Sequence, residues 1–303
     1  MGAIRFASST TFFSADTVPM ARTRHSSVFP PDPNRERAVD LALNLAEELF
    51  GVGSSGATPA WVRDRIRRYL DVTAKKDGVS IIDVAGRLLE NRSAVEDIVA
   101  SLRVGETRFY RDPSQWQALE ENLDKLFPSD MPLSVLSAGC STGEEAYTIG
   151  MLLTAARRRF KVLGVDRSAS AIAVAREATY SLDAAKDMPP TWSERFCDEQ
   201  RGRLRIGMLV RNTVEFEVCD LVKRVPQGPF HLIFFKNVLL YLTEPAGEQA
   251  ARRLANELAE RGILIAAASE VLRLKSMGLV SHRMAHGVTA LRRARRHGSS
   301  PRT

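Results

Sequence analysis

The chain has 303 residues, of which 44% are hydrophobic and 26% are charged, so it is long enough to bury one large core and a smaller one. No apolar run approaches the roughly 18 residues of a membrane helix, and the N-terminus lacks the apolar stretch of a signal peptide, which argues against membrane insertion and export. The cysteines, Cys140, Cys197 and Cys219, form no CxxC pair, so the sequence predicts neither a disulfide framework nor a metal site, and a cytoplasmic location fits.

The formal net charge of +7 is concentrated near the C-terminal end of the chain. From Val271 onward there are eight Lys or Arg residues and no acid, so the rest of the chain is close to neutral. We predict that residues 292–303 form a basic disordered tail rather than a nucleic-acid-binding arm. Residues 1–33 are rich in Ser and Thr and lack periodicity, which predicts a disordered leader.

Residues 34–104 show helical periodicity and are predicted to form a small N-terminal all-α domain. Ser80 and Ser93 are the expected N-caps of its last two helices. The four expected helices cover residues 35–50, 61–72, 80–90 and 93–103.

The second of these helices has an arginine face. Its apolar residues recur at the spacing of one buried stripe, and four arginines fall outside that stripe: Arg63, Arg65, Arg67 and Arg68. Such a face is either a solvated helix surface or a docking surface for an acidic partner, and the pattern alone leaves both readings open.

Short apolar runs alternate with helices in residues 131–291, after an interdomain segment at 105–130. This alternation predicts a parallel sheet covered on both faces, a doubly wound α/β domain that binds its ligand at the carboxyl ends of the strands. The expected strands are residues 133–138, 160–165, 214–218, 230–235 and 262–268, with early helices at 144–159 and 168–179.

The first expected strand ends in a glycine loop and two acids. Gly139 and Gly143 let the backbone turn and approach a ligand closely. Glu144 and Glu145 would repel a pyrophosphate at the start of the following helix, but they suit a cationic ligand such as S-adenosylmethionine. Asp166 ends the second strand, where an acid can accept hydrogen bonds from ribose hydroxyls. The alternative for the two glutamates is ordinary stabilisation of a helix N-terminus.

Four segments together carry a family resemblance. They are ETRFYRD (106–112), SAGCSTGEEAYTI (137–149), GVD (164–166) and FHLIFFKNVLLYL (230–242). In order and spacing, the chain resembles the CheR family of chemotaxis receptor glutamate methyltransferases over about residues 36–290. The resemblance implies an all-α domain followed by a Rossmann-like class I methyltransferase domain, with S-adenosylmethionine as cofactor and S-adenosylhomocysteine as product.

The resemblance also implies roles for individual residues. Tyr241 would stand near the methyl group, and Arg111 or Tyr241 would orient the incoming carboxylate. The alternatives are a domain-linking ion pair for Arg111 and a half-buried core ring for Tyr241. The residues implied to bind the cofactor are Thr107 and Arg111 from the interdomain segment, Glu144 for the ammonium, Asp166 for the ribose, Asp220 and Leu221 for the adenine, and Asn237 and Val238 after the fourth strand.

The chain departs from the family pattern at several positions, which leaves substrate positioning less certain than cofactor binding. Gly105 stands where the family usually has Asn, Ala146 where it has Pro, Asp220 often Asn, and Lys236 usually Arg, and AAASE (266–270) keeps only Ser269 and Glu270 of a Gly-His-Ser-Glu-like segment. Residues 195–212 look short for the small β-insertion that some family members use to hold a receptor tail.

The expected function is therefore S-adenosylmethionine-dependent esterification of glutamate carboxylates, without a general base because glutamate is already ionised at neutral pH. The implied partner is the acidic helical region of a chemoreceptor or similar signalling protein, docked on Arg63, Arg67 and Arg68. A non-catalytic adaptor that binds the cofactor or its product is one alternative. A methyltransferase for nucleic acids or amines is the other, but KNVLLY (236–241) lacks the Asn/Asp-Pro-Pro-aromatic motif expected there.

Overall fold

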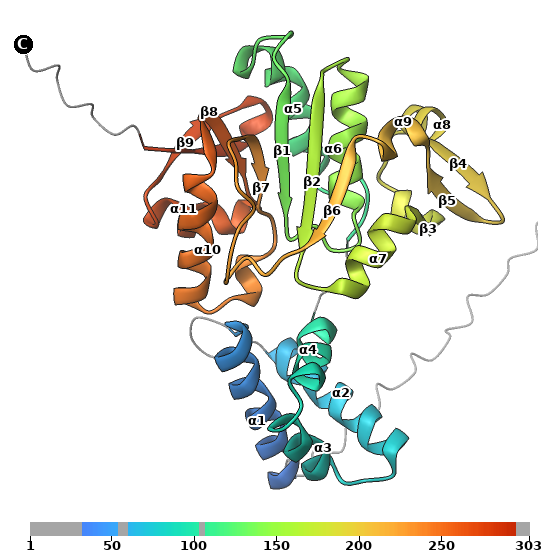
Figure 1. Ribbon diagram of the computed structural model, residues 1–303, viewed down its shortest axis with the longest axis vertical. Helices are drawn as coiled ribbons and strands as arrows, with labels where there is room; N and C mark the ends of the chain where they lie inside the picture. The colour runs from blue at the N-terminus through green and yellow to red at the C-terminus, as the bar shows by residue number, and fades with distance from the viewer. Residues whose placement is uncertain (1–31, 54–59, 103–106, 295–303) are drawn as a thin grey trace, which may run out of the picture. The chain divides into compact units, whose positions relative to one another are not determined.

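The structure is a computed structural model that describes residues 32–53, 60–102 and 107–294 (Figure 1). The predicted leader, 1–33, lies outside these ranges except for its last two residues, and residues 295–303 of the predicted tail lie outside them as well. The first part of that tail is ordered secondary structure, because strand β10 (Thr289–Arg293) extends through Arg293.

The N-terminal part of the described chain is helical and has its own apolar core. The Ser80 N-cap is confirmed, since its hydroxyl accepts from the backbone N–H of Asp83 and the Asp83 carboxylate bonds back to Ser80. The Ser93 N-cap is wrong: Asn91 precedes the last helix and accepts from the Ala94 N–H, because an amide side chain caps as well as a hydroxyl. The helices are α1 (Pro33–Phe50), α2 (Ala60–Asp77), α3 (Ile81–Leu88) and α4 (Arg92–Ser101).

A seven-stranded sheet organises the described residues that follow, in the order β6-β2-β1-β7-β8-β10-β9. The first five strands in this order are parallel, and β10 is antiparallel to both of its neighbours. The five strands expected from the sequence are confirmed. They are β1 (Leu133–Ala138), β2 (Phe160–Asp166), β6 (Val214–Val218), β7 (Phe230–Phe234) and β8 (Leu258–Ile265), and the sheet also contains β9 (Leu279–Arg283) and β10.

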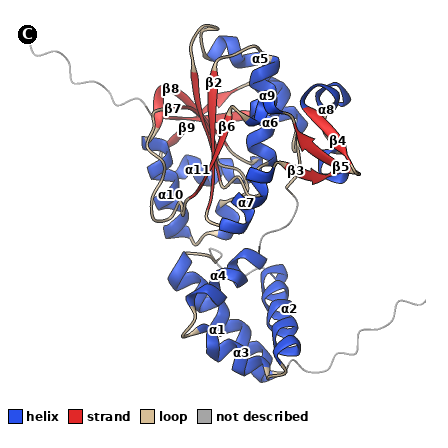
Figure 2. Ribbon diagram, turned by 45° about the vertical axis from the view of Figure 1, so that its right-hand side comes forward, coloured by secondary structure: helices blue, strands red, loops and turns tan. Residues whose placement is uncertain are grey.

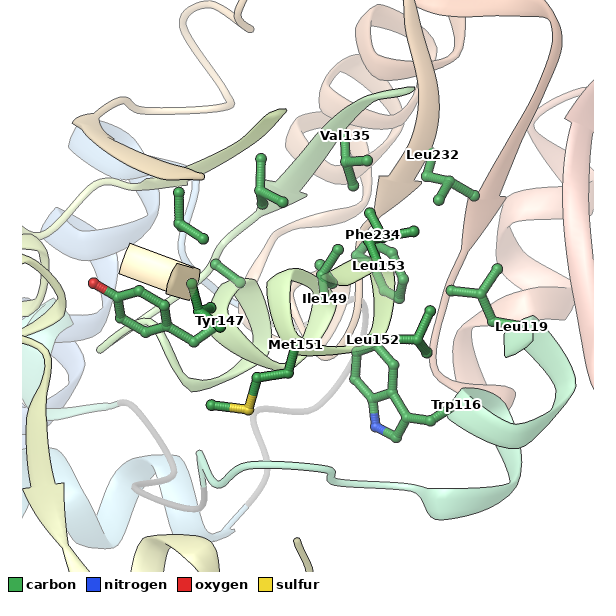
Figure 3. Close-up of a cluster of buried hydrophobic side chains, with 14 of the residues drawn as sticks. Trp116, Leu119, Val135, Tyr147, Ile149, Met151, Leu152, Leu153, Leu232 and Phe234 are labelled. Atoms are coloured by element: carbon green, nitrogen blue, oxygen red, sulfur yellow. The ribbon is translucent and has the colours of Figure 1, made fainter. Parts of the chain in front are cut away.

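Helices cover both faces of this sheet, which confirms the doubly wound α/β fold (Figure 2). Alternate strand residues enter opposite cores: Val135 and Phe234 pack on one face, and Leu136 and Phe235 on the other. Figure 3 shows the first core, where Trp116 lies among side chains from the strands and from α6. That face is covered by α5 (Pro113–Leu126), α6 (Glu144–Ala155) and α7 (Ala169–Glu177), and the opposite face by α10 (Glu244–Asn256) and α11 (Val271–Ser276).

The strand order reverses at β1, which lies between β2 on one side and β7 on the other. At such a switch point the loops after the two neighbouring strands diverge and leave a crevice at their carboxyl ends. The predicted cofactor motifs follow β1, β2, β6 and β7, so the topology brings them to the same edge of the sheet.

A second, three-stranded antiparallel sheet in the order β3-β5-β4 corrects the expectation that residues 195–212 are too short for a β-insertion. Residues 195–212 supply only the two strands of a hairpin, which needs few residues. The third strand of the sheet comes from outside this segment, directly after α7. The elements are β3 (Thr179–Ser181), α8 (Pro190–Phe196), β4 (Cys197–Gln200) and β5 (Arg203–Ile206), followed by α9 (Met208–Arg211).

Among the described residues, every helix is too short or too polar to cross a membrane.

Candidate cofactor site

A cavity opens at the carboxyl ends of the parallel strands, where the strand order reverses. One part of its wall is apolar, with Val52, Leu221, Val238 and Leu242, and another part is charged. Of the residues predicted to contact the cofactor or the methyl group, the wall contains Thr107, Arg111, Asp166, Asp220, Leu221, Asn237, Val238 and Tyr241.

The loop after β1 requires glycine at two positions. Gly139 and Gly143 have φ of +85° and +98°, in the left-handed region that disfavours residues with a Cβ. A Cβ on Gly139 would lie 2.4 Å from Cγ2 of Val238, and one on Gly143 would lie 2.8 Å from Cβ of Ala175. Gly139 therefore lets the loop after β1 pack directly against the loop after β7, and Gly143 lets the start of α6 pack closely against α7.

Asp166, the last residue of β2, is 8% exposed and is fixed by the loops around it. Its Oδ2 accepts from the Ser141 N–H at 2.9 Å, and its Oδ1 accepts from the Ser168 N–H at 2.9 Å. These two backbone N–H groups fix the orientation of the carboxylate. Such a carboxylate at the cavity wall is able to bind a ribose diol.

Glu144 and Glu145 open α6 but have different surroundings. Glu144 is buried, and its carboxylate accepts from Thr142 Oγ1 at 2.7 Å and Thr107 Oγ1 at 3.1 Å. Glu145 lies in the cavity wall and accepts from Ser137 Oγ at 2.7 Å. Burial raises the pKa of both carboxyls, because the ionised form loses its hydration. Glu145 is thus a wall residue that the sequence motif did not distinguish from its neighbour.

Arg111 lies on a backbone segment held in an unusual conformation. The residues on either side of it, Tyr110 and Asp112, have φ of 57° and 60°. The Tyr110 N–H donates to Thr148 Oγ1 at 3.1 Å, and Trp116 Nε1 donates to the Arg111 carbonyl at 2.7 Å. Left-handed backbone at non-glycine residues costs about 1–3 kcal/mol per residue and concentrates at functional sites. The surrounding structure therefore fixes where Arg111 enters the cavity wall.

Lys236, one of the departures from the family pattern, is a buried cation beside this segment. Its side chain is 3% exposed, and its Nζ lies 3.1 Å from Asp112 Oδ2 and 4.0 Å from Glu145 Oε2. The ammonium also lies 5.4 Å from the centre of the Trp116 ring. Lys236 therefore links the loop after β7 to the segment that contains Arg111.

Glu270 holds the loop after β7 through backbone hydrogen bonds. Its carboxylate is buried and accepts from the N–H of Asn237 at 2.9 Å and of Leu239 at 3.0 Å. Burial raises the Glu270 pKa, and these backbone donors oppose that rise. The φ of Asn237 is 56°, so the carboxylate stabilises a loop conformation that the residue seldom adopts alone.

Arg273 holds the turn that contains Tyr241, at 239–241. It donates to the carbonyls of Leu239 at 2.9 Å and Thr243 at 3.3 Å, one before the tyrosine and one after it. The Tyr241 ring lines the cavity and meets Trp61 edge-on, with 6.0 Å between ring centres. The sequence pattern predicts Glu270 only as a retained family residue and gives no signal for Arg273, because a residue at the start of a helix does not reveal which distant backbone groups it will bind.

The arginine face of α2 is largely paired within the chain. Arg63 lies 2.7 Å from Glu36 and 2.8 Å from Asp40, and Arg67 lies 2.8 Å from Glu36. The hydrogen bond from Arg63, and to a smaller extent the one from Arg67, lowers the pKa of Glu36. Arg68 is exposed. Docking of an acidic partner through Arg63, Arg67 and Arg68 stays a prediction, and at the first two positions the partner would compete with acids of α1.

No group of three or more His, Cys, Asp or Glu side chains within the described ranges is arranged to hold a metal ion. The donor groups of the cavity suit an organic cation with a diol: Glu145, Asp166 and Asp220 offer carboxylates, and the apolar part of the wall suits a planar base. At the start of α6 a phosphate would meet the Glu145 carboxylate as well as the backbone N–H groups, which disfavours its binding there. The residues present therefore fit S-adenosylmethionine.

The fold and this cavity together define a Rossmann-like class I methyltransferase, and comparison with known proteins specifies the family. Residues 105–286 match the family described as "CheR methyltransferase, SAM binding domain", so the chain belongs to the CheR methyltransferase family and S-adenosylmethionine is its cofactor.

Similarity to individual proteins is moderate. An uncharacterized 104.1 kDa protein of Rhodobacter capsulatus is 30% identical over 71% of this chain, which spans only 23% of that protein. A chemotaxis protein methyltransferase of Borreliella burgdorferi is 25% identical over 76% of this chain and 87% of its own length. The structure of magnesium protoporphyrin IX methyltransferase from Synechocystis PCC 6803 aligns with a TM-score of 0.35 and 13% identity over 88% of this chain and 100% of that one, a likeness that says nothing about function.

Proposed function

We propose that this chain transfers a methyl group to glutamate carboxylates of an acidic signalling protein of the chemoreceptor type. The observation that supports this most directly is Arg111, a cation whose backbone is fixed at the wall of the cofactor cavity. A guanidinium is suited to a carboxylate acceptor, because its fork of N–H donors matches the two oxygens. The relative from Borreliella burgdorferi is named for chemotaxis, which agrees with this class of partner.

The roles of the remaining residues follow from their positions. Asp166 would hold the ribose, Asp220 and Leu221 would border the adenine, and Asn237 and Val238 would line the cofactor between them and Arg111. Glu144, with Thr107 on its carboxylate, and Glu145 would hold the ammonium end. When bound, S-adenosylmethionine supplies a methyl group on a sulfonium centre, which departs as the neutral thioether of S-adenosylhomocysteine.

The chain's own contribution to catalysis is positioning. A glutamate has a reference pKa near 4.3 and is ionised at neutral pH, so no residue has to remove a proton. Arg111 would donate to the carboxylate and orient one oxygen toward the methyl carbon, and the Tyr241 hydroxyl would border the same space. Orientation of this kind is worth about 7–11 kcal/mol in well-aligned intramolecular reactions, which is sufficient without acid–base catalysis.

The experiment that tests this proposal uses S-adenosylmethionine labelled in its methyl group and the purified cytoplasmic region of a chemoreceptor. We expect label on the receptor that mild alkali releases as volatile methanol, because an ester is hydrolysed under conditions that leave methylated amines and bases intact. The Arg111→Lys variant, which keeps the charge and loses the fork, should transfer at least tenfold more slowly. Alkali-stable label would contradict the proposal, and binding of S-adenosylhomocysteine without any transfer would favour the adaptor.

A further inference from the structure

A second cavity, of about 590 Å³, adjoins the cofactor cavity. Arg111 and Asn237 belong to the walls of both, so the two cavities meet at these residues. The volume is within the range of about 300–1,000 Å³ that is typical of ligand sites. Its other lining residues are Asp112, Ser114, Gln115, Ala266, Ala267, Ala268, Ser269, Val271, His286, Gly287, Val288 and Thr289.

The second cavity is lined mainly by small side chains and by polar ones. Three consecutive alanines after β8, Ala266 to Ala268, contribute only methyl groups, so the space beside them stays open. Gln115 donates from Nε2 to the Ala266 carbonyl at 2.9 Å, while its Oε1 is buried and has no hydrogen-bond partner among the described residues. The Ser114 hydroxyl and the Gln115 amide give this wall polar groups that suit a peptide, while the three alanines leave room for one of its side chains.

The charges around this cavity favour a carboxylate at the junction with the cofactor cavity. The negative charge of Asp112 is balanced by Lys236, whose Nζ lies 3.1 Å away. His286, another lining residue, is bonded to Glu121, with 2.8 Å between Nε2 and the carboxylate. Arg111 and Asn237 line both cavities at the junction, and guanidinium and amide N–H groups can donate to a carboxylate. The Arg111 charge also acts on the Glu145 carboxyl, whose pKa it lowers against the effect of burial.

We propose that this second cavity receives the methyl acceptor: a glutamate side chain of an acidic peptide segment enters between the start of α5 and the turn after β8, and its carboxylate reaches Arg111. This inference rests on the function proposed above and adds the route by which the acceptor arrives. It assigns the acceptor to the wall formed by Ser114, Gln115 and the three alanines. The arginine face of α2, where Glu36 and Asp40 already occupy Arg63 and Arg67, is not needed for that contact.

Filling the cavity from two lining positions tests this assignment. Ala268 and Ser114 are exposed lining residues, one in the turn after β8 and one at the start of α5, so Ala268→Trp and Ser114→Trp each add an indole without disturbing a core. We expect kcat/KM for the receptor fragment to fall at least tenfold in each variant, while the Kd for S-adenosylhomocysteine stays within twofold of the wild-type value. Ala173→Trp, an exposed alanine of α7 outside both cavities, is the matched control and should leave both quantities unchanged.

The outcomes separate this inference from the proposed function. If the wild-type chain transfers methyl groups and both tryptophan variants do so at the same rate, the acceptor uses another route and the inference is overturned. Equal loss of S-adenosylhomocysteine binding in both variants would also overturn it, because the cavity would then belong to the cofactor. If the wild-type chain binds the cofactor but esterifies no acidic protein, it is the proposed function that fails.

Discussion

Arg111 and Arg63 show two ways in which this chain holds an arginine. Arg111 lies between two residues with left-handed backbone, at the wall where two cavities meet. Arg63 lies on the regular helix α2 and bonds to Glu36 and Asp40. Backbone strain of the first kind persists only where the surrounding structure enforces it, whereas the second arrangement is ordinary ion pairing between helices. The contrast predicts that mutations at the strand ends change catalysis and those on α2 change stability slightly.

The largest expected effect is at Glu270. Glu270→Ala removes the acceptor for the N–H groups of Asn237 and Leu239, so the loop after β7 loses its fixed conformation. Because a displacement of about 1 Å can cost 100-fold in rate, we expect kcat to fall by about that factor. Glu257→Ala is the matched control: Glu257 also accepts from a backbone N–H, that of Gly228, but away from both cavities. Single-turnover rates that are equal for the two variants would contradict a positioning role.

Asp166→Ala should weaken cofactor binding. The ribose loses a charged acceptor worth about 1.5–3 kcal/mol, so the Kd for S-adenosylhomocysteine should rise by roughly 10- to 150-fold. Titration calorimetry measures this directly, with Asp198→Ala on an exposed position of β4 as the control. An unchanged Kd in the Asp166 variant would show that this carboxylate does not bind the ribose.

The two regions should respond to pH with opposite signs. The Glu36 pKa is lowered, so its contribution to stability is present above its ordinary pKa near 4.5 and is lost as the pH falls through its folded value. The Glu145 pKa is raised by burial, so its contribution is present at low pH and is lost as the pH rises above about 4.5. Urea unfolding from pH 3.5 to 7.5 measures the free energy of unfolding as a function of pH. Compared with the wild-type chain, this free energy should vary less with pH below 4.5 in Glu36→Gln and above 4.5 in Glu145→Gln. The same pH dependence as the wild-type chain in both variants would contradict the lowered pKa of Glu36 and the raised pKa of Glu145.

The smallest effects are expected on α2. Arg63→Ala breaks two partly exposed ion pairs, each worth under about 1 kcal/mol, and should lower the melting temperature slightly without changing kcat. Arg68→Glu alters an exposed residue and should leave stability unchanged. If Arg68→Glu slows methylation of the receptor fragment and weakens its salt dependence, the docking prediction for this helix gains support. A rate equal to that of the wild-type chain would make the face an intramolecular ion-pair surface.

The order of strands and helices was predictable from this sequence because the parallel strands are continuous apolar runs such as residues 133–138. Strands β9 and β10 were missed, since their alternating, basic residues resemble a loop or a tail. The small sheet was missed for a different reason: β3 is three residues long, and its partner strand β5 begins only at Arg203.

The candidate site was predictable where a residue directly follows a strand. Asp166, Asn237 and Val238 lie in the cavity wall because the fold brings the carboxyl ends of the parallel strands to one edge. Contacts between distant segments gave no sequence signal. The hydrogen bond from the Asn237 N–H to Glu270 and the ion pair of Arg63 with Glu36 are therefore seen only in the structure. Counting the arginines of α2 therefore overestimated the charge available to a partner.

The most direct measurement is the crystal structure of this chain with S-adenosylhomocysteine. We expect the ribose hydroxyls to bind Asp166 and the sulfur to lie beside Arg111 and Asn237, facing the second cavity. A ligand with its sulfur directed away from that junction, or one bound outside the strand-end cavity, would contradict this expectation.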